Sequence, residues 1–97
     1  MLHIYYMTKR ERTDDEPVLH NRLRALRTDR AMSRQQVADE VGVHYQTVGY
    51  LERGEYSPSV TLALRLAGVF GVPLEAVFSL QPFQALSEHV YGTTEGM

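Results

Sequence analysis

The residues best suited to contact another molecule lie close together near the middle of the 97-residue chain. They are His44, Tyr45, Gln46, Thr47 and Tyr50. An amide can bond two polar atoms of an adenine edge, and hydroxyl or apolar groups suit the methyl group of thymine. An ordinary solvent-exposed face could also carry such residues, but two tyrosines and a histidine together are unusual there. The stretch therefore carries side chains that suit the edges of DNA bases, and Gln46 is the best candidate to read one.

A helix that exposes one face must position these side chains, and the surrounding sequence predicts a helix-turn-helix. Ser33 and Gln36 form an S-x-x-Q capping box, which is typical of the first turn of a helix. Gly42 stands where that helix has to stop, because a left-handed backbone favours glycine. Val48 and Leu51 then continue an apolar face along the next helix. The residues singled out above would lie on the outer face of that second helix.

This stretch resembles the DNA-binding motif of the Cro and lambda-repressor family, also called the xenobiotic-response-element type. The matching residues are Ser33, Val37-Ala38, Gly42-Val43, Glu52-Arg53-Gly54 and Pro58-Ser59. The likeness extends over residues 19–78, with two departures. Arg34 stands where the family usually has glutamine, and His44 stands where it usually has serine or threonine. The resemblance implies a domain that reads DNA with the start of its second motif helix.

The fold that the resemblance implies is all-α, a five-helix domain of the lambda-repressor type. The expected helices cover residues 18–30, 34–41, 45–54, 60–70 and 73–79. The expected division of the chain is an N-terminal extension (1–17), a DNA-binding domain (18–79) and a C-terminal extension (80–97).

Four further residues are candidates for contact with backbone phosphate. Arg34 begins the first motif helix, where the family glutamine bonds phosphate, and a charged donor would bind it more strongly. Arg53 follows the second motif helix and is expected to face phosphate too. Ser59 and Thr61 begin the next helix, whose free N–H groups attract anions. Ser59 has a second reading as a plain helix cap.

An ion pair between Arg27 and Glu52 is the one structural contact that the resemblance implies. Members of the family often carry arginine at the first of these positions, which would meet Glu52 at the end of the second motif helix. A partly buried pair of this kind fixes orientation more surely than it adds stability.

Composition excludes several other classes of protein. The chain has no cysteine, and its four histidines lack the spacing of metal ligands, so we expect no metal, no cofactor and no enzyme activity. Apolar runs are too short for a membrane helix, and a cytoplasmic location is expected. The net charge of −2 is weak support for a DNA-binding protein. Residues 1–34 nevertheless carry eight basic against five acidic side chains, and local charge is what meets phosphate.

The two ends of the chain leave alternatives open. Residues 1–7 fit a short strand or a frayed tail, and residues 8–17 fit a solvated linker or a basic arm lying along DNA. Leu80, Phe83 and Leu86 extend apolar character beyond the domain. They would either form a dimer interface or fold back over their own core.

The function expected from the sequence is that of a transcriptional regulator, a repressor, that binds double-stranded operator DNA as a homodimer. One alternative is an antitoxin that represses its own operon and binds a protein partner. Another is the controller of a restriction–modification operon. A third, from a different class, is an adaptor that uses the fold only for protein contacts, which the acidic residues 35–97 favour slightly.

Overall fold

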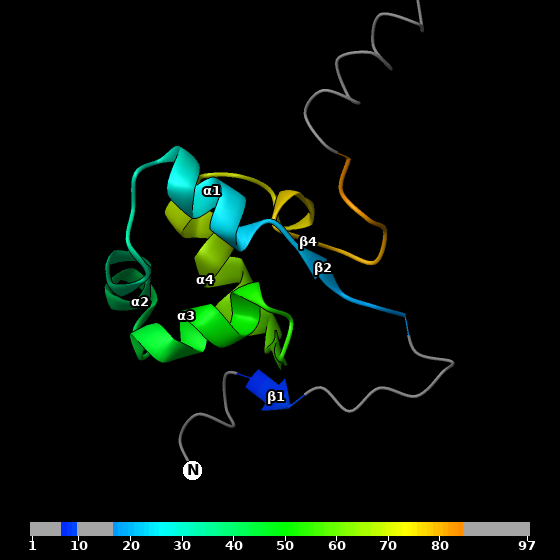
Figure 1. The fold of residues 1–97 in the computed structure, drawn as a ribbon, viewed down its shortest axis with the longest axis horizontal. Helices are drawn as coiled ribbons and strands as arrows, with labels where there is room; N and C mark the ends of the chain where they lie inside the picture. Colours follow the sequence, from blue (N-terminus) through cyan, green and yellow to red (C-terminus); the bar gives the residue numbers. More distant parts are fainter. Residues whose placement is uncertain (1–6, 10–16, 85–97) are drawn as a thin grey trace, which may run out of the picture.

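A computed structural model of the chain describes residues 7–9 and 17–84, and α-helices are the main elements of this part (Figure 1). In chain order the elements are β1 (Met7–Lys9), β2 (His20–Asn21), α1 (Leu23–Asp29), α2 (Arg34–Val41), α3 (Tyr45–Glu52), β3 (Tyr56–Pro58), α4 (Val60–Phe70), a 3-10 turn (Leu74–Ala76) and β4 (Phe78–Ser79). Among the helices of these residues, none is long and apolar enough to cross a bilayer.

Local signals set the bounds of α2 and α4, and both expected ranges are confirmed. Ser33 Oγ accepts from the Gln36 N–H at 3.0 Å while Ser33 N–H donates to Gln36 Oε1 at 2.7 Å, which completes the capping box. Ser59 Oγ accepts from the Leu62 N–H at 3.1 Å and starts α4 in the same manner. Gly42 and Gly71 end the two helices with φ of +77° and +65°.

The apolar core lies between the helices and is closed by the residues of β4. Its members are Leu23, Val37, Ala38, Val41, Val48, Leu51, Leu62, Ala63, Leu66, Ala67, Phe70, Val77 and Phe78. Two arginines complete the packing by binding carbonyls at helix ends. Arg30 Nη2 donates to the Phe70 carbonyl at 3.0 Å, and Arg65 Nη1 donates to the Val41 carbonyl at 3.4 Å. Basic groups at the carboxyl ends of helices also suit the helix dipole.

The expected five-helix architecture is wrong at both ends of the domain. The range 18–30 is too long, because α1 begins only at Leu23 and residues 20–21 form β2. The range 73–79 is not a fifth α-helix, because a single 3-10 turn leads straight into β4. The described residues therefore form four α-helices with two small two-stranded sheets.

Pairing between distant residues explains both errors. Strand β2 pairs antiparallel with β4 (Figure 1). In this pairing His20 lies opposite Ser79. The Arg22 N–H donates to the Val77 carbonyl at 2.9 Å, which holds the chain extended just before α1. Backbone N–H and C=O groups of residues 20–22 thus bond to those of residues 77–79, at the other end of the domain. A helix over residues 73–79 would have used these groups within itself and lost the pairing.

The third helix is also shorter than expected, because α3 ends at Glu52 and Gly54 adopts a φ of +74°. Beyond it, β3 pairs with β1 in a second antiparallel sheet. Thr8 and Lys9, expected in a linker, lie opposite Ser57 and Tyr56. The backbone edge of β3 offers hydrogen-bonding groups to any strand beside it, and for this reason Thr8 and Lys9 form a strand and not a linker. Residues 1–6 and 10–16, which carry the rest of the expected strand and arm, lie outside the described part of the chain.

Candidate nucleic-acid interface

Helix α3 turns one face inward and leaves the other available to a partner. Val48 and Leu51 are each only 1% exposed and anchor the inner face in the core. On the other face Tyr45 is 45% exposed and Gln46 is also exposed, while Thr47 and Tyr50 are half-buried. The side chains expected to read bases therefore lie along one helix, from its cap to its second turn.

His44 forms the amino-terminal cap of α3, a role that sequence reasoning missed. Its Nδ1 accepts from the Gln46 N–H at 3.1 Å, and its ring lies 4.7 Å from the Tyr45 ring, centroid to centroid. Because Nδ1 accepts this bond, the ring proton belongs on Nε2, which is then a donor for a partner. The departure at this position was the available signal, since serine or threonine there is typical of a cap.

At the other end of α3, Glu52 is shared by two arginines. Arg27 Nε donates to Glu52 Oε2 at 2.7 Å, and Arg34 Nε donates to Glu52 Oε1 at 3.1 Å. The Glu52 side chain is 3% exposed, against 12% for Arg27 and 41% for Arg34. Arg27 also donates to the Met32 carbonyl at 3.1 Å. The cluster joins α1, α2 and α3 and keeps one net positive charge, on Arg34, near the surface.

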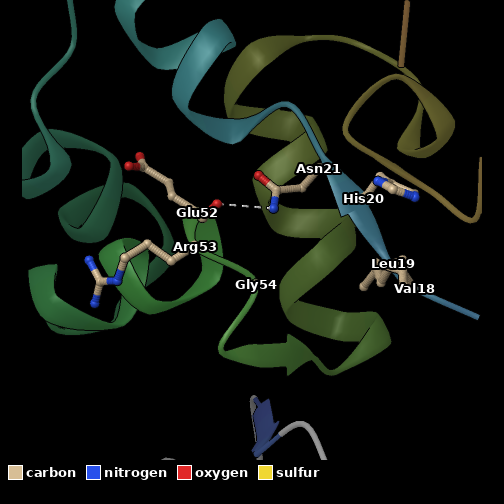
Figure 2. Close-up of a pocket in the computed structure, with 7 residues that line it drawn as sticks. All are labelled: Val18, Leu19, His20, Asn21, Glu52, Arg53 and Gly54. Atoms are coloured by element: carbon tan, nitrogen blue, oxygen red, sulfur yellow. Dashed lines mark hydrogen bonds between the residues drawn. The ribbon is translucent and has the colours of Figure 1, made fainter. Parts of the chain in front are cut away.

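Asn21 adds a contact at the same helix end that the sequence did not single out. Its Nδ2 donates to the Leu51 carbonyl at 3.0 Å and to the Glu52 carbonyl at 3.4 Å, as Figure 2 shows for the latter. Its Oδ1 accepts from the Leu23 N–H at 3.0 Å. One amide thus satisfies the last carbonyls of α3 and the first N–H of α1. An asparagine two residues before a helix was the available signal.

An open pocket lies beside this amide, with a volume of about 480 Å³ and a lining from residues 18–21 and 52–54 (Figure 2). Within the described residues no group of three or more histidine and carboxylate side chains could hold a metal ion. The pocket lining contains one histidine, His20, and a carboxylate that is already bonded to two arginines. The charged lining of this pocket is thus already engaged within the domain, since Glu52 is bonded to Arg27 and Arg34.

The other expected phosphate contacts lie around the end of α3 and the start of α4. Arg53 donates from Nε to Glu55, and this hydrogen bond raises the pKa of the Arg53 guanidinium above its ordinary value. The same guanidinium lies 5.3 Å from the centre of the Tyr50 ring, which stacks edge-on against Tyr56 at 5.2 Å. Ser59 serves as the cap of α4, and Thr61 is exposed in its first turn.

The residues expected at a dimer interface fall in different settings. Leu80 is 58% exposed. Phe83 is half-buried, and the Arg22 guanidinium carbon lies 5.4 Å from the centre of its ring. Leu86 lies outside the described residues.

Comparisons with known proteins identify this arrangement of helices as a helix-turn-helix. The helix-turn-helix family pattern fits residues 23–77 of the chain. An uncharacterized HTH-type transcriptional regulator of Archaeoglobus fulgidus is 37% identical over 60 residues, which are 62% of this chain and 86% of the relative. The uncharacterized HTH-type transcriptional regulator YgzD of Bacillus subtilis is 36% identical over 63 residues, 65% of this chain and 96% of the relative.

A solved structure supports the fold alone. The crystal structure of a transcriptional regulator from Listeria innocua superposes with a TM-score of 0.54 at 24% identity, covering 76% of this chain and 71% of that one. The family match goes further, because residues 23–77 span the capped helix pair and the Glu52-Arg53-Gly54 ending. The chain belongs to the Cro and lambda-repressor type of helix-turn-helix family, whose members are DNA-binding transcriptional regulators.

Proposed function

We propose that this chain is a sequence-specific repressor that binds operator DNA as a homodimer in the cytoplasm, with α3 in the major groove. The observation that carries the proposal is the outer face of α3. Tyr45 and Gln46 are exposed there while Val48 and Leu51 are buried on the opposite face. A helix anchored on one side, with amide, imidazole and phenol groups on the other, suits the edges of base pairs.

The proposed roles divide the surface in two. His44, Tyr45, Gln46, Thr47 and Tyr50 contact bases, and Arg34, Arg53, Ser59 and Thr61 hold backbone phosphates. The phosphate contacts fix the position of α3 without reading sequence, whereas the base contacts supply specificity. Ser59 is used twice in this scheme, because capping α4 occupies its Oγ and leaves its backbone N–H group at the helix start.

Selection of bound sites from a random DNA pool, followed by binding of the selected site to variants, tests the base-reading role. Gln46→Ala should weaken binding by about 1–3 kcal/mol and relax the preference at one base position. Gln81→Ala, which removes an exposed glutamine beyond β4, is the matched control and should change neither quantity. An equal loss on all DNA sequences for Gln46→Ala would contradict base reading.

The homodimer rests on an apolar surface at the edge of the domain. A pocket of about 400 Å³ is lined mainly by apolar side chains, among them Val60, Leu74, Phe78 and Leu80. Val60 is 72% exposed and Leu80 is 58% exposed, so an isolated chain leaves a patch that a second copy would cover. Two copies related by a two-fold axis would set their α3 helices about 34 Å apart, one turn of DNA.

Sedimentation of the intact chain and of a chain ending at Ser79 tests the dimer. We expect the intact chain to be dimeric at about ten micromolar and the shortened chain to be monomeric. A monomeric intact chain would favour a tail that folds back over its own domain. Dimerisation of both chains alike would move the interface away from Leu80, Phe83 and Leu86.

The alternatives are an antitoxin, a restriction–modification controller and a protein adaptor. The first two bind DNA in the same way and differ in the operon that they regulate. The adaptor does not, so a gel shift on random DNA at several salt concentrations separates it from the others. Binding that weakens steeply as salt rises is expected for the repressor and absent for the adaptor.

A further inference from the structure

Two guanidinium groups converge over Gly49, in the middle of α3. Arg34 comes from the first residue of α2, and Arg53 follows the last residue of α3. An ideal Cβ on Gly49 would lie 3.2 Å from Arg53 Nη1 and 3.8 Å from Arg34 Nε. The space between the two arginines is a pocket of about 170 Å³, whose other lining residues are Tyr45, Gln46 and Tyr50.

Each guanidinium is oriented by a carboxylate on one side only. Arg34 Nε is bonded to Glu52 at 3.1 Å, and Arg53 Nε is bonded to Glu55. In the part of the chain that the structure describes, no hydrogen bond uses the Nη groups of either arginine. Both therefore keep a free two-pronged donor edge, the geometry that binds a phosphate most strongly.

Gly49 is an unexpected residue within a helix, because only proline is a poorer helix former than glycine. Its backbone has ordinary helical geometry, so no left-handed turn requires it. It is nevertheless buried, covered by the two arginine side chains. A methyl group here would press on Arg53 Nη1, since 3.2 Å is closer than ordinary van der Waals contact. Glycine thus leaves the floor of the pocket open.

We propose that Arg34 and Arg53 hold one and the same phosphate of the DNA backbone, in a cradle whose floor is Gly49. Glu52 and Glu55 act as positioning residues that aim the two guanidinium groups. The proposal rests on the proposed function, because it assumes that DNA lies against the outer face of α3. It adds that the two arginines act on a single phosphate, and that they act as a unit.

The salt dependence of DNA binding tests the single phosphate. Each neutralised phosphate contributes about −0.9 to the slope of log K against log salt. The double variant Arg34→Gln/Arg53→Gln should therefore reduce the slope by about one unit in total. Two separate phosphates would reduce it by about two units, and that result, or no reduction at all, overturns the cradle.

Gly49→Ala tests the floor of the cradle, with Gly68→Ala in α4 as its matched control. A Cβ on Gly68 would meet nothing within 4 Å, so both variants gain helix propensity but only Gly49→Ala fills the pocket. Gly49→Ala should lower affinity about tenfold on selected and random DNA alike, with no fall in the midpoint of thermal unfolding. Gly68→Ala should bind like the natural chain. Equal affinities for both variants would overturn the role of Gly49.

The same experiments separate failure of the cradle from failure of the proposed function. If the natural chain binds neither selected nor random DNA, the proposed function is wrong and the cradle with it. If the natural chain binds and Gln46→Ala relaxes sequence preference, base reading stands. A slope change of two units in the double arginine variant then overturns the cradle alone.

Discussion

The two ends of α3 are held in different ways. At the amino end His44 caps the helix by accepting a hydrogen bond from the Gln46 N–H, and Tyr45 and Gln46 are exposed. At the carboxyl end Glu52 is buried against Arg27 and Arg34, while Asn21 binds the last carbonyls. Side-chain hydrogen bonds and ion pairs thus tie the carboxyl end to three other elements, β2, α1 and α2. At the amino end, the side-chain hydrogen bond that the described residues make is the cap itself.

This difference separates position from adaptability. The direction of α3 is set where the helix joins the core, through polar bonds that cannot be remade without cost. At the amino end, which we propose to contact bases, Tyr45 and Gln46 are exposed and can change rotamer without disturbing the core. A helix held in this way can change its amino-terminal residues with little effect on folding, whereas its carboxyl end tolerates little change.

The largest expected effect follows from removing Glu52. Glu52→Leu strands the Arg27 charge, which is 12% exposed, and should lower the free energy of unfolding by about 3–5 kcal/mol. Glu55→Gln is the control, because its pair with Arg53 is about half exposed on both sides and should be worth under about 1 kcal/mol. Urea denaturation of both variants measures the two losses.

The double variant Arg27→Met/Glu52→Leu sharpens this result. Replacing both partners by apolar groups removes the stranded charge, so much of the lost stability should return. If the double variant loses as much stability as Arg27→Met and Glu52→Leu lose together, the buried pair does not stabilise the carboxyl end of α3. Equal losses for Glu52→Leu and Glu55→Gln would likewise mean that the buried pair is worth no more than the exposed one.

The smallest expected effect is at the amino end. His44→Ala removes the cap acceptor and should lower the free energy of unfolding by about 1 kcal/mol, which the same denaturation measures. His44→Ser supplies a hydroxyl acceptor at the same place and should keep the stability of the natural chain. If His44→Ser is as unstable as His44→Ala, then the imidazole contributes through its contact with Tyr45 and not as a cap.

The sequence predicted those parts of the fold that depend on neighbouring residues. The ranges of α2 and α4 follow from Ser33, Ser59 and the glycines that end each helix, all of which act within a few residues. The pairing of β2 with β4 depends on backbone groups at opposite ends of the domain, and no local pattern encodes it. The apolar residues Leu74, Val77 and Phe78 fitted a helix equally well, and the partner strand decided between a helix and a strand.

In the candidate site, too, features set by local spacing could be predicted and features set by contacts between distant residues could not. The outer face of α3 could be predicted, because Val48 and Leu51 fix the inner face by their spacing. The double partnership of Glu52 could not, because it depends on how α1 and α2 cross α3 and on the length of Arg34. The same applies to Gly49, since a glycine in a helix carries no sign of what covers it.

The pairing of β2 with β4 also decides how the domain can be joined to other proteins. Because the chain enters and leaves the helical core through adjacent strands, the two ends of this core, at His20 and Ser79, lie side by side. A domain of this kind can be inserted as a cassette into a surface loop of a host protein, without pulling the loop apart. Because its two attachment points are adjacent, the insertion adds little to the entropic cost of closing the host loop. The host protein thereby acquires a second folding unit at one place on its surface.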